Sequence, residues 1–484
     1  MQSVFEKLVA RPQRAILLFS LVLLLAGNWI LPLTDRDETR FAEASREMLQ
    51  RGDYVVPWFN GAWRFDKPVL IYWCQMASYR VFGENDFAAR LPSVLFTTAT
   101  ALLLVRWGRK RMTAQTGFFA GAMFVAGLHV AIIGRVATAD MAMVFFSTLA
   151  VWSGWELTRP ELANQEANRR RWWWIFYVTL ALGFLAKGPV AWLPLGGILL
   201  GRVLRKDSFR LPLLETVVGL CVAVALASLW GIPALEQTHG QYLKVGMGEH
   251  VVFRSVGVID SHGLKGLSGF FLLLPLYFVT FFASFFPWST RVPSALRRWW
   301  PERKHDDLGW YLLTQALLVF VVFSFVRTKL PHYTMPAFPC LALWLARQIS
   351  FEGKSFAWFQ KRFLAMAVFI LALTLAGFSV ARNFLLTENL WRAVQPHVRP
   401  ETKVACLGYT EPSLVWKFRG VSTNIVVLGD AKLARDFLTN APPFILVLPA
   451  KDFAQLPDTS GIIFHVRGLD LVKFKNWDLT AIVR

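Results

Sequence analysis

Residues 34–73 read TDRDETRFAEASREMLQRGDYVVPWFNGAWRFDKPVLIYW, and they follow an apolar run at 15–33 that is long enough to cross a bilayer. Their first eighteen positions hold nine acidic and basic residues, and an Asp-Lys-Pro triplet stands at 66–68. A charged segment at a membrane surface is a candidate functional site. A structural interpretation stays open, because Thr34 and Asp37 have capping-box spacing and Asp37 could simply begin an amphipathic helix on the membrane.

The composition of the whole chain is that of an integral membrane protein. Of its 484 residues, 55% are hydrophobic and 17% are charged, whereas about 25% of a soluble domain would be charged. The net charge of +20 could suggest nucleic-acid binding, but the basic residues fall in short clusters between apolar runs, as in cytoplasmic membrane loops. We therefore predict a membrane protein without a nucleic-acid partner. The four cysteines show neither a paired framework nor metal-ligand spacing.

Apolar segments recur along the chain and predict a polytopic α-helical fold with about eleven transmembrane helices, within a range of ten to thirteen. After the first run they lie at 87–105, 113–133, 136–157, 172–186, 189–204, 211–232, 267–288, 308–326, 331–346 and 363–380. With the N-terminus inside, every short inner loop is basic, whereas the outer connections carry isolated cations or offset them with acids. The odd number of spans then places the C-terminus outside.

Beyond about residue 382 the composition changes to that of a soluble module. Short helical patterns, such as 431–438, alternate with β-rich runs at 404–407, 425–428, 444–448 and 462–466. This alternation predicts a small α/β domain. We therefore expect a transmembrane domain at 1–382, with long outer loops at 34–86 and 233–266, and an α/β domain at 383–484 on the outer side.

Charged residues at the outer ends of the spans are further candidates. Asp140 in GRVATADMAM starts the fourth span, and Lys187 in AKGP lies where two short spans meet. A carboxylate at a membrane boundary is costly unless it is paired, hydrated or functional, although Asp140 could also merely complement a helix dipole. Lys187 could snorkel to the interface, but beside the helix start that Pro189 predicts it would suit a lipid phosphate.

A third basic element, RTKLPHY, places Arg327, Lys329 and His332 between the ninth and tenth spans. Arg can bind a phosphate through two parallel hydrogen bonds and Lys acts as a point charge, so this set suits a phosphate-linked lipid. The alternative is an ordinary outer turn anchored by basic and aromatic residues.

The long outer loop at 233–266 contains several acidic residues and histidines, among them His250. These oxygen and nitrogen ligands could bind a divalent cation together with Asp66, although they lack a dense ligand spacing. A divalent metal ion is therefore the one cofactor that the sequence suggests.

Several motifs resemble one family, the bacterial GT-C glycosyltransferases of the aminoarabinose transferase and protein mannosyltransferase type. DETRFAEASREML, GDYVVPWFNG and FDKPVLIYW are similar to its first outer loop, and KGP, KLPHY and EPSLVW to later elements. The segment from Glu249 to Arg254 resembles the family loop that closes over the donor. The resemblance spans nearly the whole chain and is weakest in the tail. One difference is Phe41, where the family usually has Tyr.

The resemblance implies a sugar transferase with its active site and C-terminus on the periplasmic face of the bacterial inner membrane. The donor would be a sugar, an aminoarabinose-like pentose or a hexose, on undecaprenyl phosphate, and the acceptor lipid A or another envelope lipid or glycan. A protein O-mannosyltransferase is the alternative within the enzymes. A lipid transporter or flippase is the alternative outside them, but transporters tend to place charges near the bilayer midplane and to show repeats.

The resemblance also implies roles for individual residues. Asp37 would be the catalytic Asp, as the base for an acceptor hydroxyl or, with a phosphate acceptor, as the group that orients the acceptor or stabilises the positive sugar, and Asp140 would be the second catalytic carboxylate. The expected residues for binding the donor phosphate are Lys67, Lys187, Arg327 and Lys329. The expected supporting residues are Glu38, Arg40 and His332.

Overall fold

The computed structural model describes residues 8–159, 161, 165–205, 211–246, 248, 266–350, 355–422, 424–456, 460–470 and 475–484. By its internal contacts the chain divides into two units. The first comprises Met1–Ala26, Phe65–Ile71 and Leu91–Leu371, and the second Gly27–Arg64, Tyr72–Arg90 and Ala372–Arg484. The second unit thus joins most of the charged stretch at 34–73 to the C-terminal residues. The domain boundary between residues 382 and 383 stays a prediction.

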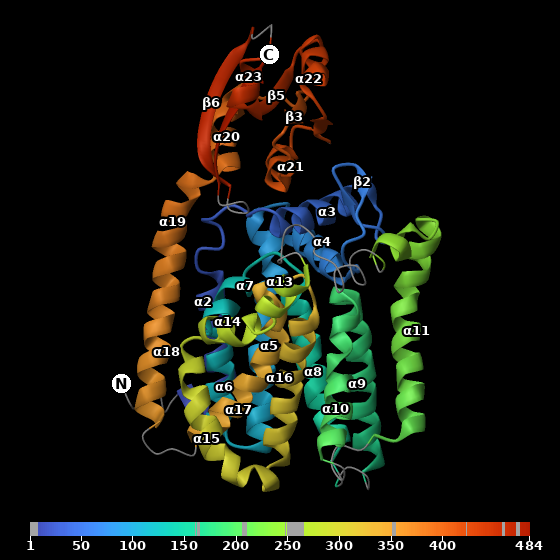
Figure 1. The fold of residues 1–484 in the computed structure, drawn as a ribbon, viewed down its shortest axis with the longest axis vertical. Coiled ribbons are helices and arrows are strands. Elements are labelled where there is room, and N and C mark those ends of the chain that lie inside the picture. Colours follow the sequence, from blue (N-terminus) through green and yellow to red (C-terminus); the bar gives the residue numbers. More distant parts are fainter. Residues whose placement is uncertain are drawn as a thin grey trace. The chain divides into compact units, whose positions relative to one another are not determined.

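The first unit is a bundle of apolar helices (Figure 1). In a lipid environment a helix satisfies its own backbone hydrogen bonds, so apolar runs of this length fold as helices. The α-helices are α2 (Pro12–Leu25), α5 (Asp86–Arg111), α6 (Ala114–Val125), α7 (Leu128–Ile133), α8 (Asp140–Leu157), α9 (Glu166–Lys187), α10 (Leu193–Leu204), α11 (Leu213–Gln237), α13 (Gly266–Leu273), α14 (Leu276–Ser284), α15 (Val292–Glu302), α16 (Asp307–Phe325), α17 (Phe338–Ser350) and α18 (Ser355–Ala372). Residues 86–90 of α5 and residue 372 of α18 belong to the second unit.

Four helices of the described chain are long and apolar enough to cross a membrane by themselves. They are α5, α11, α16 and the continuous segment Phe356–Phe384, which begins in α18. The pair Phe271–Ser284 and Trp288–His305, bent by 105°, is a fifth candidate. The helical membrane fold predicted from the sequence is confirmed, whereas the count of eleven spans stays a prediction.

Several predicted spans are broken where the sequence places Pro or Gly. The segment 113–133 is divided into α6 and α7 at Gly127, and 267–288 is divided into α13 and α14 before Leu276. Pro189 and Pro331 begin the 3₁₀ helices η2 (Pro189–Trp192) and η6 (Pro331–Ala337). Because Pro has no N–H to donate, it starts these segments more easily than it continues a helix.

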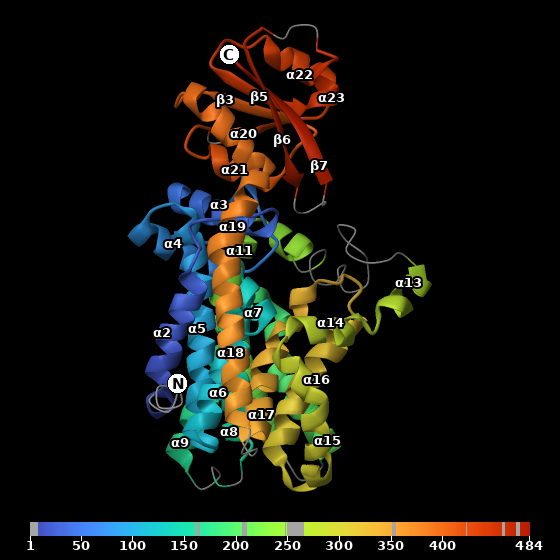
Figure 2. The ribbon, with the colours of Figure 1, turned by 90° about the vertical axis from the view of Figure 1, so that its left-hand side faces the viewer.

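The second unit contains a five-stranded mixed sheet, whose strands β3, β5, β6 and β7 are labelled in Figure 2. Its strands are β3 (Lys403–Leu407), β4 (Val426–Leu428), β5 (Phe444–Pro449), β6 (Ile462–Asp470) and β7 (Lys475–Val483), in the order β4-β3-β5-β7-β6. Ala405 of β3 lies opposite Val426 and Leu446 in parallel pairs. Ile482 of β7 lies opposite Leu446 and Ile463 in antiparallel pairs.

Alternating side chains of the sheet pack against helices on both faces. Val404 and Cys406 share a buried cluster with residues of α20 (Leu386–Val394) and α21 (Pro412–Phe418). Ala405 and Leu407 belong to a second cluster with α22 (Ala431–Leu438). The predicted small α/β architecture is therefore confirmed. β7 was not predicted, because its first half, KNWD, is polar and only the last five residues are buried.

The charged stretch folds within the second unit as a helix, a short hairpin and a second helix. These are α3 (Asp37–Arg51), the two-residue strands β1 (Trp58–Phe59) and β2 (Ala62–Trp63), and α4 (Leu70–Phe82), whose first two residues belong to the first unit. α3 ends at Gly52, which adopts φ +67°, a conformation that glycine reaches without strain.

Candidate functional site

Three residues that are far apart in the sequence form a charged cluster in the first unit. Asp140 begins α8, Lys187 ends α9, and His332 lies in η6. The Lys187 ammonium donates to Oδ1 of Asp140, and His332 Nε2 lies 3.8 Å from the same oxygen. The second oxygen, Oδ2, accepts a hydrogen bond of 2.9 Å from the Thr138 hydroxyl. The predicted acid, cation and imidazole are thus brought together.

The cluster is largely withdrawn from solvent. The side chains of Asp140 and Lys187 are 8% and 12% exposed, and the Lys187 ammonium lies 5.5 Å from the centre of the Tyr333 ring. A buried carboxylate is tolerated only when it is paired and hydrogen-bonded. Asp140 therefore does more than begin a helix, because it holds the ammonium of Lys187 in place.

Lys187 also lines a cavity of about 440 Å³ within the first unit. Aromatic and aliphatic side chains make most of its wall, with contributions from α9, η2, α11, the end of α16 and the segment at 65–68. The charged residues of its lining are Asp66, Lys67 and Lys187. An apolar cavity with a few convergent charged groups is the usual form of a small-molecule site.

The segment with Asp66 and Lys67 is held at the cavity by Tyr242, in the helical turn that follows α11. The Tyr242 hydroxyl donates to the Lys67 carbonyl at 2.5 Å, and the Tyr242 ring packs edge-on against Phe65 at 5.4 Å. The Lys67 ammonium donates to the Asp66 carbonyl at 3.0 Å. Tyr242 was not singled out from the sequence, since an isolated aromatic residue in a loop gives no signal.

Lys329 has a different environment. Its side chain is buried, and its ammonium donates to the carbonyls of Phe323 and Ser324, at 3.0 Å and 2.5 Å, in the last turn of α16. A cation at this position satisfies the unpaired carbonyls of a helix end. Burial lowers the pKa of Lys329 to about 8. Arg327, two residues before it, is partly exposed. Phosphate binding by these two residues stays a prediction.

Asp37, Glu38 and Arg40 lie in the first turn of α3, in the second unit. Asp37 is exposed, Glu38 is buried and Arg40 is partly buried. Of the structural alternative, the helix start at Asp37 is confirmed, whereas the capping box of Thr34 with Asp37 is not formed. The Thr34 amide and hydroxyl donate to Glu38 Oε2 at 3.0 Å and 2.9 Å, because the helix begins one turn after Thr34 and Glu38 folds back over that turn.

Glu38 is also paired with Arg90, a residue that was not predicted. Two nitrogens of the Arg90 guanidinium donate to the two Glu38 oxygens, both at 2.8 Å. The same guanidinium donates to the carbonyls of Asn28, Leu31 and Pro32. This network fixes the chain just before α3. The contacts of Glu38 are therefore structural, whereas its predicted supporting role in catalysis is untested.

The predicted metal site is incomplete in the described chain. His250 lies outside the described residues, and those residues contain no group of three or more His, Cys, Asp or Glu side chains that could hold a metal ion. Asp66 itself stands at the cavity with Lys67 as its neighbour. A divalent ion bound by Asp66 and His250 stays a prediction.

Several known proteins are similar to this chain in sequence. A family model described as dolichyl-phosphate-mannose-protein mannosyltransferase matches residues 66–230. The undecaprenyl phosphate-alpha-4-amino-4-deoxy-L-arabinose arabinosyl transferase of Pectobacterium atrosepticum is 32% identical over 340 residues, which are 68% of this chain and 58% of that protein. An uncharacterised protein of Aquifex aeolicus is 29% identical over 351 residues, covering 72% of this chain and 76% of that protein. The chain thus matches only 58% of the length of the Pectobacterium atrosepticum transferase.

Two solved structures are similar to this chain in fold. ArnT from Cupriavidus metallidurans, crystallised with undecaprenyl phosphate, matches 96% of this chain and 97% of its own with a TM-score of 0.74 at 17% identity. The oligosaccharyltransferase of Archaeoglobus fulgidus matches 88% of this chain and 64% of its own, with a TM-score of 0.54 at 13% identity. At these identities the likeness concerns the fold alone.

Proposed function

Since this chain is a GT-C membrane protein related to the aminoarabinose transferases and the protein mannosyltransferases, we propose that it transfers a sugar from undecaprenyl phosphate to lipid A or another acceptor of the cell envelope. The family resemblance predicted from the sequence is confirmed by these relatives. The chain is a multi-pass protein of the bacterial inner membrane. We place its active site and C-terminus on the periplasmic face, because every short predicted inner loop is basic.

The observation that carries this proposal is the apolar cavity with Lys67 and Lys187 in its lining. A prenyl phosphate needs apolar walls for its chain and cations for its phosphate. A cavity of about 440 Å³ suits a ligand of drug size, so it would hold the sugar phosphate and the first prenyl units. The rest of the prenyl chain would lie in the bilayer.

The reaction breaks the bond between the anomeric carbon and the phosphate oxygen. The phosphate leaves with the electron pair, and an acceptor oxygen forms the new bond to the same carbon. Negative charge grows on the leaving phosphate, so cations that face it lower the barrier. Lys67 and Lys187 are the proposed cations. Lys187 would then exchange the Asp140 carboxylate for the phosphate, and Asp140 would retain its bond from Thr138.

We propose Asp37 as the residue that serves the acceptor. Its carboxylate is exposed in the first turn of α3, between residues that are anchored on both sides. If the acceptor is a hydroxyl, Asp37 would take its proton as a general base. If the acceptor is already a phosphate, no base is needed, and Asp37 would stabilise the positive charge on the sugar.

Protein O-mannosyl transfer is a second candidate, favoured by the family model that matches residues 66–230. It would use the same leaving group, but a hexose donor and a Ser or Thr hydroxyl as acceptor. A base would then be obligatory, so the two candidates also differ in how strongly they depend on Asp37.

Purified protein in lipid vesicles, supplied with labelled undecaprenyl-phosphate aminoarabinose or mannose, would separate the candidates. Label that moves from aminoarabinose donor to lipid A supports the first proposal. Label that moves from mannose donor to a peptide supports the second. Donor that crosses the bilayer without any sugar transfer would contradict both and indicate a transporter. The Lys187→Gln variant, which removes a proposed phosphate cation, is the negative control.

A further inference from the structure

The C-terminal residues of the second unit contact the chain immediately before Asp37. The backbone N–H of Ser413 donates to Asp35 Oδ1 at 2.6 Å, and the Ser413 hydroxyl donates to Asp35 Oδ2 at 2.5 Å. Both carboxylate oxygens of Asp35 are therefore held by a single residue that is 378 positions away in the sequence. Ser413 itself is buried at the start of α21.

The next residue is held by the same segment. Arg36 Nε donates to Glu411 Oε2 at 3.2 Å, and the Glu411 side chain is only 4% exposed. The side chains of two consecutive residues, Asp35 and Arg36, are thus bound by residues of the segment 411–413. These three residues belong to the EPSLVW stretch, whose only signal in the sequence is its resemblance to the family.

The residues on the other side of Asp37 are anchored as well. Glu38 accepts hydrogen bonds from Thr34 and Arg90, and the buried Thr39 hydroxyl lies 3.3 Å from Asp35 Oδ1. Among residues 35–39 the exposed side chain is that of Asp37, and it forms no hydrogen bond or ion pair with the described residues. The anchors therefore fix the backbone that carries Asp37 while leaving its carboxylate available.

We propose that Glu411 and Ser413 are positioning residues for Asp37: by holding Asp35 and Arg36 they set the direction of the Asp37 carboxylate. This inference rests on the proposed function, in which Asp37 acts on the acceptor. A displacement of about 1 Å in a catalytic group can lower the rate about 100-fold. Loss of the Ser413 hydroxyl should therefore lower kcat by about 10- to 100-fold and leave the KM for donor within about 2-fold.

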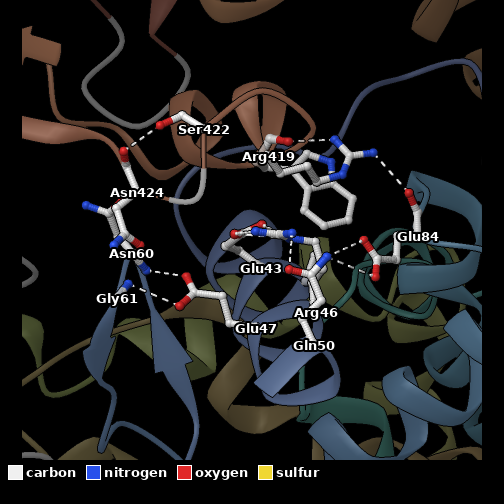
Figure 3. A network of polar contacts seen from close by, with 12 residues as sticks. Glu43, Arg46, Glu47, Gln50, Asn60, Gly61, Glu84, Arg419, Ser422 and Asn424 are labelled. Carbon is white, nitrogen blue, oxygen red and sulfur yellow. Dashed lines mark hydrogen bonds and ion pairs between the residues drawn. The ribbon is translucent and has the colours of Figure 1, made fainter. Parts of the chain in front are cut away.

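The same unit offers a matched control. Figure 3 shows Glu47 of α3 held to the backbone of Asn60 and Gly61 in the hairpin. Asn60 in turn exchanges two hydrogen bonds with the Ile425 backbone, at 2.9 Å and 2.7 Å. This second contact joins the hairpin to the C-terminal residues without touching residues 35–39. Asn60 has φ +52°, so Asn60→Gly removes the contact without straining the backbone.

The test compares Ser413→Ala, Ser413→Thr and Asn60→Gly in the full-length protein, with two measurements on each. The first is kcat and donor KM for sugar transfer. The second is deuterium exchange of the peptides that cover residues 34–40. We expect Ser413→Ala to lose kcat and to exchange faster at 34–40. Ser413→Thr, which retains a hydroxyl and the backbone N–H, should restore both, and Asn60→Gly should keep the wild-type kcat.

The two measurements separate this inference from the proposed function. Unchanged exchange at 34–40 in Ser413→Ala would overturn the inference, whether or not the protein transfers sugar. Faster exchange with an unchanged kcat would also overturn it, since the segment would then be held without consequence for Asp37. If the wild-type protein transfers no sugar, the proposed function fails, and faster exchange in Ser413→Ala would still support the anchoring of residues 34–40.

Discussion

The Asp35 carboxylate should make the stability of the second unit depend on pH in an unusual direction. Burial raises the pKa of Asp35 from 3.8 to about 6, and the negative charge of Glu411 adds to the effect. The hydrogen bonds from Ser413 and Thr39 act in the opposite direction without cancelling it. The folded protein therefore holds a proton on Asp35 more tightly than the unfolded chain does.

The sign and the size of the effect follow from this difference. A difference of about two pKa units corresponds to about 3 kcal/mol between the protonated and ionised forms. That stabilisation is fully present below about pH 4 and is lost as the pH rises through about 6. A carboxylate in an ordinary ion pair has a lowered pKa, so its contribution to the stability of the folded protein is lost as the pH falls. Replacing Asp35 by Asn removes the titration and keeps a side chain that can still accept from the Ser413 N–H.

The assay is thermal unfolding of the detergent-solubilised protein between pH 4 and pH 8. The informative quantity is the difference between wild type and Asp35→Asn at each pH, since all other groups cancel in that difference. The wild type should lose stability relative to the variant by about 3 kcal/mol as the pH rises from 4 to 7. A difference that is constant with pH, or that grows in favour of the wild type, would refute the assignment of a buried carboxylate with a raised pKa.

Three further predictions concern single side chains. Glu38→Gln should destabilise the protein by about 3 to 5 kcal/mol, visible as a lower unfolding temperature, because it leaves the buried Arg90 guanidinium without its carboxylate; an unchanged temperature would argue against the ion pair. Asp37→Asn should keep normal membrane abundance but lower kcat by about 10² to 10⁴ when the acceptor is a hydroxyl, and near wild-type turnover would exclude a base at this position. If Lys329 binds the donor phosphate as predicted from the sequence, the kcat/KM for donor should fall as the pH rises above about 8, where Lys329 loses its charge, and Lys329→Arg should lose this dependence; an identical profile in both proteins would contradict that predicted contact.

The sequence predicted the helices and most of the C-terminal strands because their signals are local. Helix α16 (Asp307–Phe325) lies within one residue of the predicted span at 308–326, and α22 coincides with the predicted pattern at 431–438. The breaks at Gly127 and before Leu276 were missed, since hydropathy averages over a window and does not register a single turn. Strand β7 was missed because its first half is polar and gives no strand signal, and the strand forms through its pairing with β5 and β6.

In the candidate site, too, the sequence indicated single residues but not the contacts between distant segments. Motif and charge drew attention to Asp140, Lys187 and His332, and the fold brings these three together. Nothing local indicated that Arg90 pairs with Glu38 or that Ser413 holds Asp35, because each of these contacts joins distant segments of the chain. For Lys329, the motif RTKLPHY drew attention to the residue but did not reveal that its ammonium donates to the carbonyls of a helix end.

Equilibrium binding of undecaprenyl phosphate and undecaprenol to the purified protein would show whether the cavity lined by Lys67 and Lys187 binds a prenyl phosphate. The double variant Asp140→Asn with Lys187→Gln removes the cation without leaving its carboxylate partner unpaired. We predict that wild type prefers the phosphate and that the double variant loses about 10- to 100-fold in affinity for it, the value of one charge-assisted hydrogen bond. Equal affinity of both proteins for undecaprenyl phosphate, or equal affinity of the wild type for undecaprenyl phosphate and undecaprenol, would exclude a phosphate site at Lys187.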